Sequence, residues 1–153
     1  MCLTQETFVN RISKEVEQSE KEKPVRLCLY GEDGMKIVRM IAEKLKLRYT
    51  MRNTNKFNKE NYLKKLCGKY GSKQILVIKG HHIRTNKIDE FDEQLQTIIR
   101  HAKYWKLIVL LCDENPFKFF KFKEERLKEW KFNHELRIFN TNDMVTYTPI
   151  EIQ

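Results

Sequence analysis

The sequence has little of what would mark a secreted, membrane-spanning or low-complexity protein. Its 153 residues include 5 glycines and 3 prolines, and its longest apolar run, Leu107 to Cys112, is far too short to cross a bilayer. Residues 1–20 carry Glu15, Glu17 and Glu20 where a secretory signal peptide would be apolar. These absences predict an intracellular protein of the cytoplasm or nucleus.

Cysteine is also scarce, and its spacing excludes the usual metal and redox motifs. The four cysteines are Cys2, Cys28, Cys67 and Cys112. They form no CxxC pair, and Cys28 lies inside an apolar run and not at a helix start, which disfavours a thioredoxin-like site. His81 and His82 are adjacent, so on a strand they would point to opposite faces and would not share one metal ion. We expect buried thiols in a reducing compartment, no metal site and no cofactor.

No arrangement of catalytic side chains stands out from the composition. Among 21 Asp and Glu residues, no Ser-His-Asp, Cys-His or paired-carboxylate pattern rises above chance. The sequence therefore nominates no catalytic residue.

Positive charge is what the chain has in excess. Its 30 Lys and Arg residues give a formal net charge of +9, a field that attracts nucleic acid, an anionic membrane or an acidic protein. Residues 117–123 interleave aromatic rings with Lys118, Lys121 and Lys123, as single-strand binding by base stacking and phosphate contact requires. The competing interpretation is that these rings are core and that the lysines belong to ordinary solvated faces.

Apolar patterning predicts strands alternating with helices. Continuous apolar runs typical of buried strands lie at Val25–Tyr30, Leu47–Met51, Gln74–Ile78, Lys106–Leu111 and Leu136–Phe139. Helical periodicity occurs at residues 8–16, 37–45, 62–70, 89–101 and 123–132. Residues 143–153 carry no pattern that predicts an element.

This alternation predicts a three-layer α/β domain. Right-handed crossovers between the strands produce a mainly parallel sheet of five strands with helices on both faces, because strands this apolar need cover on both sides. We find no repeat and no boundary, so residues 1–153 read as a single domain. It comprises an N-terminal helix and linker (1–23), an α/β core (24–142) and a tail (143–153).

A glycine turn follows the first predicted core strand, where phosphate-binding loops occur. Gly31 and Gly34 precede Lys36 at the start of a helix. The P-loop pattern requires two glycines four residues apart, then Lys and a hydroxyl residue, whereas here the glycines are two residues apart and Ile37 replaces the hydroxyl. The residues between the glycines are both acidic and would repel a triphosphate. A simple strand-to-helix turn is the plainer interpretation.

The second half of a nucleotide site is also degenerate. A central strand would end in an acidic residue that holds magnesium, but Lys79 follows the strand Gln74–Ile78. Two losses at separate motifs argue against ATP hydrolysis.

The order of elements and one short motif resemble the helicase domain of superfamily 3, an AAA+-like P-loop NTPase domain of small DNA virus replication initiators. In that family a hydrophobic strand ends in an Asn that senses the γ-phosphate, often followed by Pro, and an acidic segment with an Arg comes soon after. Asn115, Pro116 and Arg126 match those positions. The resemblance implies a P-loop NTPase-like fold with a vestigial nucleotide site at Gly31, Gly34, Lys36, Asn115 and Arg126. Asn-Pro also initiates turns on its own.

These departures predict a non-catalytic relative that is retained for binding. We expect no nicking domain of the kind that precedes the helicase part in the family within residues 1–153, and both nucleotide motifs are altered. We expect an inactive helicase-like or ATPase-like domain that binds nucleic acid or a protein partner, and no membrane, through Lys118, Lys121 and Lys123. The alternatives are an oligomerisation or protein-interaction module without a nucleic-acid role, and a weakly active NTPase.

Overall fold

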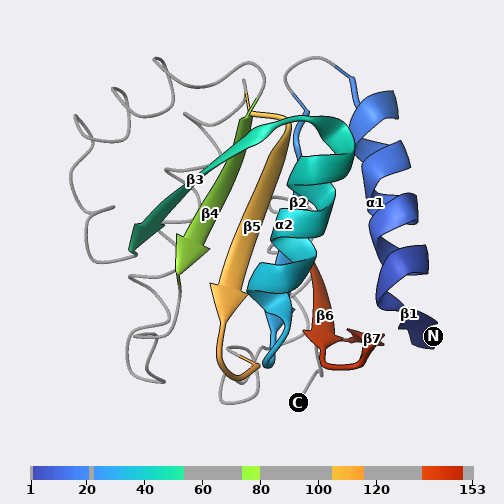
Figure 1. Cartoon of the computed structure of the whole chain (residues 1–153). Coiled ribbons are helices and arrows are strands. Elements are labelled where there is room, and N and C mark those ends of the chain that lie inside the picture. Colours follow the sequence, from blue (N-terminus) through green and yellow to red (C-terminus); the bar gives the residue numbers. More distant parts are fainter. Residues whose placement is uncertain (1, 21–22, 54–73, 80–104, 116–135, 150–153) are drawn as a thin grey trace, which may run out of the picture.

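The computed structural model describes residues 2–20, 23–53, 74–79, 105–115 and 136–149. In chain order its elements are β1 (Cys2–Thr4), α1 (Gln5–Gln18), β2 (Val25–Tyr30), α2 (Gly34–Leu45), β3 (Arg48–Asn53), β4 (Gln74–Lys79), β5 (Leu107–Cys112), β6 (Arg137–Thr141) and β7 (Met144–Thr148). They form an α/β structure in which α1 and α2 lie side by side on one face of a twisted sheet (Figure 1).

The described strands make one sheet of mixed direction. Their order is β1-β7-β6-β2-β5-β4-β3. The strands from β6 to β3 pair in parallel, whereas β7 pairs antiparallel with both β6 and β1. The expectation of five strands was therefore wrong, because the sheet has seven. The two extra strands close one edge as a small antiparallel extension.

Neither extra strand has the sequence pattern of a buried strand. β1 has three residues, too few to display an alternation. In β7 only Val145 is buried, and Met144 and Tyr147 are exposed. β7 lies in residues 143–153, where no element was predicted, and β1 lies in residues 1–23, where only a helix and linker were predicted.

The two described helices form where the sequence predicts them, and local chemistry sets their ends. Thr4 caps α1, since its hydroxyl oxygen accepts a bond from the Thr7 amide at 3.1 Å. α2 stops at Lys46, whose φ of 55° is left-handed and ends the helix as a glycine commonly does. No described helix is long and apolar enough to cross a membrane.

The sheet is buried through both faces of its central strands. Alternate residues of β2, β4 and β5, such as Leu27, Ile75 and Val109, pack with α1 and α2 in the main core. Residues of the opposite register, such as Leu76 and Leu110, are also buried. Burial on both faces explains why these strands read as continuous apolar runs. The helices expected at residues 62–70, 89–101 and 123–132 lie outside the described residues.

Candidate functional site

The carboxyl ends of three neighbouring strands bring the predicted nucleotide-site turn to one edge of the sheet. β2 lies between β5 and β6 and is parallel to both, so residues 31–34, 113–115 and 142 follow the strands at the same edge. In open α/β sheets, ligands bind outside the carboxyl ends of the strands. This edge is therefore the candidate site. It lies at the amino-terminal end of α2, at the bottom of Figure 1.

Both glycines of the turn lie where a side chain would meet close neighbours. Gly31 has φ of 109°, a backbone conformation that side chains rarely adopt, and a Cβ there would lie 2.8 Å from Asn142 Oδ1 and 2.9 Å from Asn140 Oδ1. A Cβ on Gly34, the first residue of α2, would clash with a methyl group of Leu111. The glycines fit the turn tightly against β5 and the β6–β7 corner.

Two amides of the turn are bound by the chain itself. The Asp33 amide donates to the Thr141 carbonyl oxygen at 2.8 Å. The Glu32 amide donates to Asn142 Oδ1 at 3.3 Å. A working phosphate loop directs such amides at the phosphate groups. Here two of them are directed at the β6–β7 corner.

Side chains from two other elements fasten the same turn. The Gln5 amide group, at the start of α1, donates to Asp33 Oδ2 at 2.7 Å and to the Asn142 carbonyl oxygen at 2.7 Å. The Thr141 hydroxyl, in a buried residue, donates to the Tyr30 carbonyl oxygen at 3.0 Å. The amino-terminal helix, the turn and the last hairpin thus form one hydrogen-bonded unit.

Ile37 and Lys79, which the sequence aligns with the two magnesium-binding positions of a P-loop site, have other roles in the structure. Ile37, where a P-loop has its hydroxyl, is 0% exposed and belongs to the main core. Lys79 is the half-buried last residue of β4 and aligns with Leu111 of β5. Among the described residues, no group of three His, Cys, Asp or Glu side chains is placed to hold a metal ion.

The other predicted site residues divide into those that the structure places and those outside it. Lys36 lies in the first turn of α2 and is exposed. Asn115 follows β5 at the candidate edge, is half-buried and has an interaction partner. Arg126 and the lysines of residues 117–123 lie outside the described residues.

Sequence reasoning missed the residues that close the turn. Gln5, Asn140, Thr141 and Asn142 were given no role, although the polar run from Asn140 to Asp143 is a turn signal directly after a strand. That signal predicts the β6–β7 turn. It does not show that the turn folds back onto residues more than a hundred positions earlier.

A buried thiol pair lies beside the site without taking part in it. Cys28 of β2 and Cys112 of β5 are both buried and free, and the strand register puts them on the same face of the sheet. Burial, and next the hydrogen bond and negative charge of neighbouring Cys112, raise the pKa of the Cys28 thiol well above its ordinary value. A thiol held neutral in this way is a poor nucleophile.

Comparisons with known proteins identify no family for this chain. No protein-family model matches it, and no curated protein matches it. Among solved structures it is similar to domain III of the replication initiation protein DnaA from Thermotoga maritima, with a TM-score of 0.46 and 16% sequence identity. The match covers 89% of this chain and 62% of that one, so this chain spans less than two thirds of its neighbour. A likeness of this size assigns neither family nor activity, and the resemblance to superfamily 3 remains a hypothesis.

Proposed function

We propose that this chain is a non-catalytic, P-loop NTPase-like domain that acts by binding nucleic acid or a protein partner and does not turn over a nucleotide. One observation carries the proposal: two amides of the turn that would hold the phosphates donate to the chain itself. Asp33 and Glu32 donate to Thr141 and Asn142, and Gln5 fastens the arrangement from α1.

Binding a nucleotide would require this turn to open. Each lost hydrogen bond costs about 0.5–1.5 kcal/mol, and the Thr141 and Asn142 oxygens would need new donors. Gly31 would also have to leave the place where Asn140 and Asn142 surround it. All of these costs would make the free energy of phosphate binding less favourable.

Charge adds a second obstacle at the same place. Glu32 and Asp33 are carboxylates within the turn, and like charges on the turn and on a triphosphate repel each other. The Asp33 carboxylate is held in position by Gln5 and is not free to swing away without losing that bond. Lys79, at the end of β4, supplies a positive charge where a magnesium ion would need a carboxylate.

Calorimetry with ATP and magnesium, paired with a phosphate-release assay, tests the loss of nucleotide chemistry. We expect no binding heat and no phosphate release. The matched variant is Lys36→Ala: in a working P-loop the lysine contacts the phosphates, so its loss would abolish activity, whereas here it should change nothing. Micromolar affinity with phosphate release that Lys36→Ala removes would overturn the proposal.

The binding role is supported by the net charge of +9 and by the cations of residues 117–123. Reversing the charge of Lys118, Lys121 and Lys123 tests that segment. If all three contact phosphates of a single strand, the log–log salt slope of binding should fall by about 0.7 for each contact removed. An unchanged slope would exclude the segment from phosphate contact. A concentration-dependent oligomer that ignores nucleic acid at low salt would favour the interaction module instead.

A further inference from the structure

One flank of α2 carries exposed positive charge that α1 does not neutralise. Lys44 marks the flank next to α1, since its ammonium group donates to Asn10 Oδ1. Arg39 is five residues earlier, which at 3.6 residues per turn places it about 140° around the helix from Lys44. Arg39 is exposed. It therefore lies on the flank turned away from α1, over the side of the sheet that ends in β3 (Figure 1).

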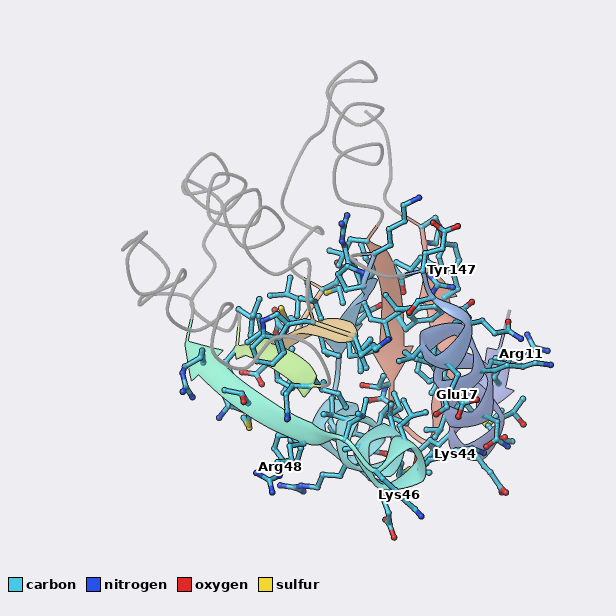
Figure 2. All side chains as sticks on the ribbon, turned by 90° about the horizontal axis from the view of Figure 1, so that it is seen from above. Arg11, Glu17, Lys44, Lys46, Arg48 and Tyr147 are labelled. Carbon is cyan, nitrogen blue, oxygen red and sulfur yellow. The ribbon has the colours of Figure 1, made fainter. Side chains whose placement is uncertain are left out.

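The turn from α2 into β3 adds one more cation and a ring. Lys46, which follows the last residue of α2, is exposed, and Figure 2 shows it directed outward at the end of the helix. Tyr49 is 39% exposed, which makes it one of the few large apolar side chains at the surface of the described residues. Strand register aligns it with Ile75, a core residue beneath the helices, so the ring is on the same face of the sheet as α2.

We propose that the α2–β3 surface, formed by Arg39, Lys46 and Tyr49, binds single-stranded nucleic acid. The two cations would contact phosphates of the strand, and an unpaired base would stack on the Tyr49 ring. Charge complementarity supports this occupant, because α2 carries Lys36, Arg39 and Lys44 against one acidic residue, Glu43, which lies between Arg39 and Lys46 on the helix surface. The inference rests on the proposed function in one respect, namely that the chain acts by binding.

The exposed ring favours a single strand over other polyanions. Bases of a single strand are free to stack on an aromatic side chain, whereas paired bases already stack on one another. An acidic protein segment would satisfy the cations but would gain little from Tyr49. Dependence of binding on the ring therefore separates these occupants.

Fluorescence anisotropy with a labelled thymidine oligonucleotide of about 12 nucleotides, a length within the usual site sizes, tests the cations. The test variant is Arg39→Gln with Lys46→Gln. The control is Lys14→Gln with Lys44→Gln, which removes the same charge from exposed positions on α1 and on the flank of α2 beside it. Losing two phosphate contacts should lower the log–log salt slope by about 1.4 in the test variant and should leave the control slope unchanged.

The ring is tested in the same assay at constant charge. Tyr49→Ala should weaken binding roughly 5- to 150-fold, and Tyr49→Phe should bind within about twofold of the unaltered protein, because stacking needs the ring and not the hydroxyl. Circular dichroism confirms that each variant is folded.

Four outcomes would overturn the inference. They are no oligonucleotide binding at low salt, equal slopes in the two double variants, no effect of Tyr49→Ala, or binding of an acidic peptide in preference to the strand. None of them depends on the phosphate-release assay, so the failure of this inference and that of the proposed function are distinguishable.

Discussion

Replacing Gly31 with alanine tests whether the turn is closed in the way its contacts indicate. The φ of 109° is unfavourable for alanine, and a backbone held in such a region costs about 1–3 kcal/mol. The new methyl would also meet Asn142 Oδ1 at 2.8 Å, which would have to move and weaken its bond from the Glu32 amide, a loss of about 0.5–1.5 kcal/mol. We expect Gly31→Ala to lower the free energy of unfolding by about 2–4 kcal/mol.

Urea denaturation measures this loss directly. The midpoint should fall while the m-value stays constant, because the change acts on one turn and not on the extent of the unfolded surface. A domain of this size has a stability of about 5–15 kcal/mol, so the variant should still fold. Its melting temperature should drop by roughly 4–16 °C. The matched control is Lys36→Ala, an exposed position in α2, where a change within about 0.5 kcal/mol is expected. A Gly31→Ala cost no larger than that of the control would refute the description of the turn.

Three further predictions concern side chains away from the turn. Arg137 donates to both carboxylate oxygens of Glu15, at 3.0 Å from Nη1 to Oε1, but both side chains are about two-fifths exposed. Glu15→Gln should therefore cost at most about 1 kcal/mol in urea denaturation, and the cost should shrink in high salt, whereas Glu17→Gln on the same helix should cost less. Burial, with the neighbouring Cys112 second, raises the pKa of the Cys28 thiol, so in the native protein a thiol reagent should modify exposed Cys2 and spare Cys28, as mass spectrometry would show. Because the folded pKa lies above the unfolded one, this thiol stabilises the fold fully below about pH 8.5 and progressively less as the pH rises beyond it, which denaturation at several pH values would detect.

The central strands were predictable because burial on both faces leaves a mark in the sequence. Val25–Tyr30 matches β2 at both ends, and the runs Gln74–Ile78 and Lys106–Leu111 lie within one residue of β4 and β5. A strand enclosed on both sides has no position that favours a polar residue, so it appears as an unbroken apolar run. β7 carries no such mark, since it lies near the edge of the sheet and buries a single side chain, Val145.

The position of the candidate site was predictable from the sequence, but the hydrogen bonds that close its turn were not. The sequence places a glycine turn between a strand and a helix, with Ile37 and Lys79 at the positions where a P-loop site would have its magnesium ligands. The contacts that close the turn join residues separated by 110 positions, from Glu32 to Asn142, and by 137 positions, from Gln5 to Asn142. Neither apolar periodicity nor local turn chemistry contains information about pairs so far apart. The pairing of β6 with β2 and β7 brings Glu32 to Asn142, and the pairing of β1 with β7 brings Gln5 there.

The strength of that long-range closure is measurable by combining the two sides of the contact. Asn142→Ala removes the oxygen that lies 2.8 Å from the Cβ position of residue 31, together with the bond from the Glu32 amide. In that background Gly31→Ala keeps its backbone strain and its approach to Asn140 but no longer displaces Asn142. The double variant should therefore lose less stability than the sum of the two single variants, by at least about 0.5 kcal/mol. Urea denaturation of the four proteins completes the cycle. Additive losses would mean that residues 31 and 142 do not share a contact. The hydrogen bond from the Glu32 amide to Asn142 would then no longer support the proposal of a non-catalytic domain.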